Sequence, residues 1–235
     1  MFTKKKEKIH FVGIGGIGMS AIASVLNAMG YTITGSDLSK TEKTKSLEKS
    51  GIKVFYGHKA SNIKDDIIAV VTSSAISPTN EEIIEAKKKK IMVISRGEML
   101  AELMRLKYGI AISGSHGKTT TTSLISQIMV YAGLNPVCII GGNHFNLKSN
   151  ALCEDLNSEY LVCEADESDG SFLRLSPVIN IVTNIDNDHL DYYKNVENLT
   201  RKCGYEIIFT DKNLTKGEIL WLLHYLCSAP SDTNS

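Results

Sequence analysis

A glycine turn between an apolar run and a helical stretch constrains this chain more than any other feature of its sequence. The apolar run covers residues 109–113, and the helical stretch covers residues 121–129. This order predicts a strand, a turn and a helix N-terminus, which together aim free backbone N–H groups and the positive end of a helix dipole at one point. The turn between them consists of Gly114, Ser115, His116, Gly117, Lys118, Thr119 and Thr120. Because Lys118 adds a mobile charge and Thr119 a hydroxyl for Mg²⁺, we expect ATP to bind here.

The turn is shorter than the common phosphate-binding loop. That loop has four residues between its glycines, whereas Gly114 and Gly117 enclose only Ser115 and His116. An ordinary helix start that happens to contain glycine and lysine is the alternative. The preceding apolar run, the paired glycines and the four consecutive threonines at the helix start favour the phosphate site.

A second glycine turn lies near the N-terminus, after the apolar run 9–12 and before the helical stretch 21–29. Its glycines satisfy the G-x-G-x-x-G pattern, and Asp37 ends the next predicted strand, where a carboxylate would bond a ribose or a base edge. The pattern predicts a diphosphate cradle made of Gly13, Ile14, Gly15, Gly16, Ile17, Gly18, Met19 and Ser20. NAD and a UDP-sugar both carry a diphosphate. A purely structural role in close strand–helix packing is the third interpretation.

Short apolar runs alternate with helical stretches between these turns and beyond them, for example at residues 67–72, 81–89, 91–94 and 99–106. This alternation is typical of βαβ units and a parallel sheet. We therefore predict an α/β protein. A Rossmann-like parallel-sheet domain should occupy residues 1–107, and a P-loop-type α/β ATP-binding domain should begin at residue 108.

The composition excludes several classes of function. The 26 basic and 26 acidic residues among 235 cancel, so no global field recruits nucleic acid or an anionic membrane. No apolar stretch approaches the roughly 20 residues of a membrane span. The five cysteines form no C-x-x-C pair, which fits reduced thiols and suggests no zinc site. We expect a cytoplasmic protein with neither a nucleic-acid nor a membrane partner, and the sequence leaves its oligomeric state unknown.

Acidic residues follow the apolar run 160–163, where the ATP loop needs ligands for its metal. Glu164 stands at the carboxyl end of this predicted strand, the place where α/β sheets carry their ligands. Asp166, Glu167 and Asp169 are second choices, because some of these carboxylates could cap a helix instead. Glu164 is therefore the predicted metal ligand.

A histidine follows the next apolar run, residues 178–185. His189 lies between two aspartates at the carboxyl end of that predicted strand. A lone histidine is more often an ordinary surface or core residue, but these surroundings favour a metal or phosphate role.

With these motifs in order, residues 7–199 resemble the Mur ligases of peptidoglycan synthesis. The similarity rests on the short ATP loop, the acidic stretch 164–169, and the stretches 183–185 and 188–191. The N-terminal turn 13–20 resembles that of the alanine-adding member rather than those of the later ligases. The resemblance implies an ATP-dependent ligase that joins L-alanine to the lactyl carboxylate of UDP-N-acetylmuramic acid through an acyl phosphate.

The resemblance also implies roles for individual residues. Residues 13–20 would hold the UDP diphosphate, with Asp37 near the uridine and Ser73 and Ser74 assisting. Lys118 would hold the β- and γ-phosphates of ATP.

Metal binding is implied in the same way. Thr119 and Glu164 would hold one Mg²⁺ or Mn²⁺, and His189 would help to hold a second metal shared with Glu164. Lys118, Glu164 and His189 are thus the expected catalytic residues.

Residues 200–235 depart from the family pattern. We expect a partial ATP-binding domain over residues 108–199, an atypical tail over residues 200–235 and no C-terminal ligase domain. Two alternatives stay open. One is a truncated, non-ligating fragment that keeps UDP-sugar and ATP affinity. The other is an NAD-dependent dehydrogenase, which explains the N-terminal turn but leaves Lys118, Glu164 and His189 without a role.

Overall fold

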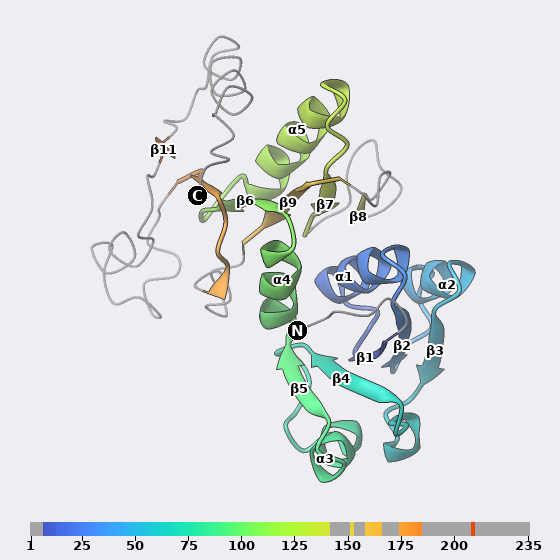
Figure 1. The fold of residues 1–235 in the computed structure, drawn as a ribbon. Helices are drawn as coiled ribbons and strands as arrows, with labels where there is room; N and C mark the ends of the chain where they lie inside the picture. Colours follow the sequence, from blue (N-terminus) through green and yellow to red (C-terminus); the bar gives the residue numbers. More distant parts are fainter. Residues whose placement is uncertain (1–6, 142–150, 153–157, 166–173, 185–207, 210–235) are drawn as a thin grey trace, which may run out of the picture.

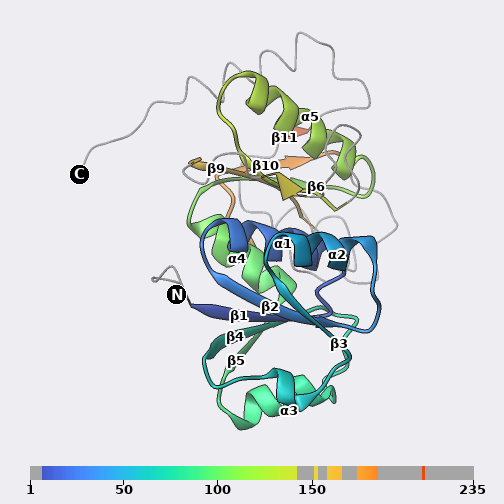
Figure 2. The ribbon, with the colours of Figure 1, turned by 90° about the vertical axis from the view of Figure 1, so that its right-hand side faces the viewer.

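The computed structural model describes residues 7–141, 151–152, 158–165, 174–184 and 208–209. These residues form two β-sheets with helices between them and on both outer faces (Figures 1 and 2). Figure 2 shows the order of the layers: α5, the second sheet, the layer of α1, α2 and α4, the first sheet, and α3. The helical layer in the middle therefore touches both sheets.

The first sheet is parallel, with strand order β3-β2-β1-β4-β5. The order reverses between β1 and β4, and open α/β sheets bind ligands at the carboxyl ends of strands at such a point. Its strands are β1 (Lys8–Val12), β2 (Thr32–Asp37), β3 (Lys53–Tyr56), β4 (Ile67–Thr72) and β5 (Met92–Ser95).

Local capping signals fix where the connecting helices begin. Thr41 and Ser95 each form a capping box with the residue three positions on, and the Asn80 side chain accepts from the N–H of Glu82. The helices are α1 (Ile17–Ala28), α2 (Glu42–Lys49), α3 (Glu81–Lys88), α4 (Arg96–Arg105) and the 3₁₀ helix η1 (Ala60–Asn62).

The second sheet has the order β11-β10-β6-β9-β7-β8 and is parallel except for β8, which pairs antiparallel with β7. Helix α5 (Lys118–Tyr131) follows β6 and packs on the outer face (Figure 2). The strands are β6 (Tyr108–Ser113), β7 (Val137–Ile139), β8 (Ala151–Leu152), β9 (Tyr160–Glu164), β10 (Ile179–Val182) and β11 (Ile208–Phe209).

One apolar core joins the two sheets through α1 and α4. Phe11 of the first sheet, Ile22 of α1, Leu103 of α4 and Leu161 of the second sheet are all at most 3% exposed and belong to one cluster. Burial of such side chains contributes roughly 1.5–3 kcal/mol each. The two glycine turns are thus held on a shared, packed framework.

These observations confirm the predicted fold class. The sequence did not predict α2, β3 or β7, which are short, and it predicted the stretch 99–106 where α4 begins earlier, at Arg96. Within the ranges that the structure describes, no helix combines the length and apolar character needed to cross a bilayer.

Candidate functional site

The predicted diphosphate cradle lies at the carboxyl end of β1, where Gly13 turns with a φ of +78°. This turn directs the N–H groups of Gly13 and Ile14 at the carbonyl oxygen of Ser36, at 2.8 and 2.9 Å. The N–H of Gly16 donates to the carbonyl of Gly13 at 3.2 Å. The N–H groups at these three positions of the predicted cradle are therefore bonded within the protein. A phosphate site on the first turn of α1, which contains Gly18, stays a prediction.

Asp37 supports the same turn from the end of β2. Its carboxylate accepts hydrogen bonds from the backbone N–H of Gly15 at 2.8 Å and of Ser39 at 3.0 Å. A Cβ on Gly15 would lie 2.8 Å from Asp37 Oδ2, so a larger residue here would displace the Asp37 carboxylate. A carboxylate offers about four lone-pair sites. The predicted bond from Asp37 to a ribose therefore stays a prediction beside the observed structural role.

Ser73 and Ser74 follow β4 at the point where the strand order reverses. A Cβ built on Gly13 would lie 3.8 Å from Ser73 Oγ, so this hydroxyl borders the glycine turn. Ser74 is exposed. The structure thus brings Ser73 to the predicted cradle.

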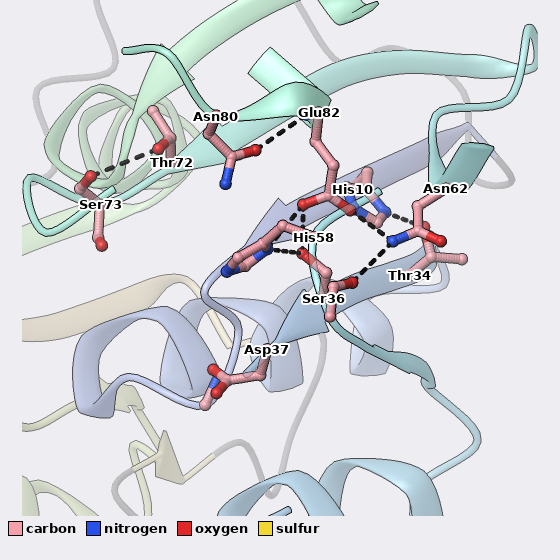
Figure 3. A network of polar contacts seen from close by, with 12 residues as sticks. His10, Thr34, Ser36, Asp37, His58, Asn62, Thr72, Ser73, Asn80 and Glu82 are labelled. Atoms are coloured by element: carbon pink, nitrogen blue, oxygen red, sulfur yellow. Dashed lines mark hydrogen bonds and ion pairs between the residues drawn. The ribbon is translucent and has the colours of Figure 1, made fainter. Parts of the chain in front are cut away.

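A buried polar network, absent from the sequence predictions, joins side chains of β1, β2, η1 and α3 (Figure 3). Glu82 is fully buried, and its carboxylate accepts from Ser36 Oγ at 2.6 Å and from Asn62 Nδ2 at 2.7 Å. His58 Nδ1 lies 2.9 Å from Glu82 Oε2, and His10 Nε2 lies 3.3 Å from Glu82 Oε1. The Ser36 carbonyl accepts hydrogen bonds from the glycine turn, and the Ser36 hydroxyl donates to Glu82. Ser36 therefore connects this network to the predicted cradle.

Burial alone raises the pKa of Glu82, but the hydrogen bonds from His10, Ser36 and Asn62 outweigh burial and lower it below the ordinary value. Glu82 is therefore a buried carboxylate stabilised in its charged form. No local sequence signal indicates this network, because its members lie far apart in the chain and meet only in the folded structure.

The predicted ATP loop connects β6 to α5, with positive φ angles of 128° at Gly114 and 81° at Gly117. Both angles favour glycine. The Lys118 ammonium reaches back across the loop and donates to the Gly114 carbonyl. The charged group of Lys118 is thus held against the first residue of the turn.

Residues at the end of β10 brace this loop. Asn184 accepts from the N–H of His116 at 2.8 Å and donates to the His116 carbonyl at 2.9 Å. The Thr183 hydroxyl donates to the same carbonyl at 2.6 Å, and a Cβ on Gly114 would lie 2.1 Å from that hydroxyl. The carbonyl of Asn184 accepts from the N–H of Ser115 at 3.2 Å. Two loop N–H groups that were expected to be open are therefore bonded to Asn184.

Glu164 ends β9, next to β6 in the sheet, where Ile112 is its register partner. A Cβ on Gly141 would lie 2.4 Å from Glu164 Oε2, so the carboxylate rests against the Gly141 backbone. Thr119 follows Lys118 in the first turn of α5. A carboxylate and a hydroxyl are oxygen donors of the kind that Mg²⁺ prefers, so the donor set fits a magnesium ion.

His189 and the second choices Asp166, Glu167 and Asp169 lie outside the described residues. Within the part of the chain that is described, no group of three or more His, Cys, Asp or Glu side chains gathers as a metal site. A metal held by Thr119, Glu164 and His189 accordingly stays a prediction.

A cavity of about 180 Å³ lies between the two units. It brings together Gly18 of the N-terminal cradle, Lys118 of the ATP loop and Glu164 of β9, which the sequence predicted separately. It also contains Arg96, which the sequence analysis missed, although arginine directly after a capping serine places a cation at a helix start. The lining residues are Gly18, Ile22, Arg96, Leu100, Lys118, Ile139, Ile140, Gly141, Glu164 and Ala165.

Comparison with known proteins gives a consistent result for both units. The Mur ligase family catalytic domain matches residues 8–108, and the Mur ligase middle domain matches residues 112–213.

Three relatives illustrate the similarity. The chain is 87% identical to UDP-N-acetylmuramate–L-alanine ligase of Brachyspira hyodysenteriae over 199 residues, which are 85% of this chain and 43% of that protein. The crystal structure of UDP-N-acetylmuramate-alanine ligase MurC from Thermotoga maritima has a TM-score of 0.69 at 35% identity, covering 83% of this chain and 45% of that one. A UDP-N-acetylmuramate:L-alanyl-gamma-D-glutamyl-meso-diaminopimelate ligase from Neisseria meningitides has a TM-score of 0.76 at 25% identity, covering 93% and 75%.

The chain spans 43% of the length of the Brachyspira relative. The two matched domains nevertheless cover both glycine turns and the cavity between them, in the order in which the sequence presents them. The chain belongs to the Mur ligase family.

Proposed function

We propose that this chain carries the UDP-sugar-binding and ATP-binding parts of a ligase that joins L-alanine to UDP-N-acetylmuramic acid. The observation that carries the proposal is the shared cavity, in which Gly18, Lys118 and Glu164 meet. A ligase that activates a carboxylate with ATP needs both substrates to reach one point. A dehydrogenase would not need Lys118 or Glu164 there, which argues against NAD as the ligand of the N-terminal turn.

In this proposal residues 1–107 bind the sugar nucleotide and residues 108–199 bind ATP. Residues 13–20 would hold the diphosphate, chiefly through the first turn of α1, because the Gly13–Ser36 bond closes the turn itself. Asp37, Ser73 and Ser74 would complete the sugar-nucleotide site. ATP would lie on residues 114–120, with Lys118 at its β- and γ-phosphates.

The reaction would proceed in two steps. The lactyl carboxylate attacks the γ-phosphorus in line and ADP leaves, and the amine of alanine then attacks the carbonyl carbon of the acyl phosphate, losing a proton as inorganic phosphate departs. Both first reactants are anionic, so Lys118 would act by neutralising charge and by alignment. A divalent cation held by Thr119, Glu164 and His189 would supply further charge neutralisation.

No nucleophilic side chain is required in this scheme. Burial, assisted by the charge of Glu164, raises the pKa of the neighbouring Cys163 thiol to about 12. That thiol therefore stays protonated at neutral pH and does not compete with the substrate carboxylate. A cytoplasmic location, with its reduced thiols and nucleotide substrates, agrees with this proposal.

Trapping the acyl phosphate with hydroxylamine tests the first step directly. The chain is incubated with ATP, Mg²⁺, UDP-N-acetylmuramic acid and hydroxylamine, and the UDP-muramyl hydroxamate is measured by mass spectrometry, with Lys118→Ala as control. ATP-dependent hydroxamate in the wild type and its loss in the variant are expected. Binding of both nucleotides without any hydroxamate, or without alanine-dependent product when alanine replaces hydroxylamine, would favour the non-ligating fragment instead.

A further inference from the structure

We propose that Arg96 binds the lactyl carboxylate of the sugar nucleotide and turns it toward the γ-phosphate of ATP. The inference rests on the proposed function and deepens it, because it assigns a substrate group to a residue outside both glycine turns.

The position of Arg96 is fixed from two sides. It is the first residue of α4, whose start is set by the capping box in which Ser95 and Glu98 exchange side-chain and backbone hydrogen bonds. Its guanidinium packs against the first turn of α1, since a Cβ on Gly18 would lie 2.9 Å from Nη1 and 3.1 Å from Cδ of Arg96. Glycine at position 18 leaves the space that the arginine occupies.

The charges around the cavity point to an anionic guest beside the ATP phosphates. Among the residues that the structure describes, three charged side chains line it: Arg96, Lys118 and Glu164. Lys118 belongs to the ATP loop, Glu164 suits a metal ion, and Arg96 is the second cation of this lining. A guanidinium presents a planar fork that matches a carboxylate with two parallel hydrogen bonds. Glycine and apolar residues form the rest of the lining, and a less polar surrounding strengthens such a pair.

The size of the cavity limits what it can hold. Sites for whole small-molecule ligands occupy roughly 300–1,000 Å³, and this cavity measures about 180 Å³. It is too small for a nucleotide. It does suit the reacting ends of two ligands, a carboxylate and a phosphoryl group, whose nucleotide parts lie on the two glycine turns outside it.

Two sugar nucleotides that differ only at the proposed contact provide the test. UDP-N-acetylglucosamine is UDP-N-acetylmuramic acid without the lactyl ether and its carboxylate. Dissociation constants for both are measured by calorimetry on the wild type, Arg96→Gln and Arg96→Lys. Arg105→Gln, at the exposed end of the same helix, is the control.

We expect Arg96→Gln to weaken the binding of UDP-N-acetylmuramic acid by about ten- to a hundred-fold, the range for the loss of a hydrogen bond to a charged group. The dissociation constant of UDP-N-acetylglucosamine should change by less than about twofold. Arg96→Lys, which keeps the charge and loses the fork, should retain part of the preference for the muramic acid, and Arg105→Gln should leave both constants unchanged.

An equal loss for both sugar nucleotides would assign Arg96 to the diphosphate and overturn the inference, as would unchanged constants in Arg96→Gln. If Arg96→Gln does not fold, an unaltered preference in folded Arg96→Lys likewise overturns it. A wild type that binds neither sugar nucleotide would refute the proposed function itself. If the wild type instead binds both sugar nucleotides and its preference for UDP-N-acetylmuramic acid does not depend on Arg96, only the inference about Arg96 fails.

Discussion

At the scale of single residues, the role predicted for Lys118 can be tested through the affinity of the chain for ATP. Its ammonium lies across the loop on the Gly114 carbonyl. Lys118→Ala should weaken ATP binding by about ten- to a hundred-fold, because it removes a charge-assisted contact worth roughly 1.5–3 kcal/mol. Calorimetry with ATP and Mg²⁺ measures the effect, and Lys88→Ala, at the exposed end of α3, is the control. An unchanged ATP affinity in Lys118→Ala would remove this lysine from the site.

Glu82 gives a prediction about pH. The pKa of Glu82 is lower in the folded protein than its ordinary value of 4.5. The charged carboxylate therefore stabilises the folded state above about pH 4.5, and this stabilisation is lost as the pH falls through the folded-state pKa. Glu82→Gln should lower the free energy of unfolding by about 1.5–3 kcal/mol at pH 7. The neutral amide would replace a carboxylate that accepts hydrogen bonds from Ser36 and Asn62. Urea denaturation at pH 7 and at pH 4 should show a smaller gap between variant and wild type at pH 4. Exposed Glu81→Gln is the matched control, and an equal gap at both pH values would contradict the assignment.

At the scale of elements, the end of β10 and the ATP loop act as one unit. Asn184→Ala removes both side-chain bonds to the His116 backbone. The loop would then have to be ordered by ATP itself, so ATP affinity should fall by about fivefold, which corresponds to the roughly 1 kcal/mol of a typical hydrogen bond. Asn27→Ala, which removes a side-chain bond far from the loop, should leave ATP affinity unchanged. A loss of stability in Asn184→Ala with full ATP affinity would show that the brace is only structural.

The elements also show what sequence patterns can predict. Apolar runs and glycine turns predicted four of the five strands of the first sheet and three of the six described strands of the second, because periodicity and turn chemistry are local properties. The start of α4 was missed because its signal is the Ser95 capping box rather than the apolar stretch that follows. The brace by Asn184 and the buried Glu82 network could not be predicted, since each joins residues far apart in the chain whose proximity depends on the completed sheets.

At the scale of the whole molecule, the two units share the core around α1 and α4, and this packing makes one cavity from two motifs. The sequence predicted each motif but not their distance from one another. It also could not reveal Arg96 as part of the site, because the contact with Gly18 exists only once α1 and α4 pack together.

The central claim is that the N-terminal turn binds a UDP-sugar within reach of ATP. The melting temperature of the chain, measured with UDP-N-acetylmuramic acid, with NAD and with ATP and Mg²⁺, tests it most directly, because a ligand that binds only the folded state stabilises it by mass action. At a ligand concentration about 100 times the dissociation constant, the free energy of unfolding rises by roughly 2.7 kcal/mol. The account predicts a rise with UDP-N-acetylmuramic acid and with ATP, and none with NAD. A rise with NAD and none with the UDP-sugar would contradict it.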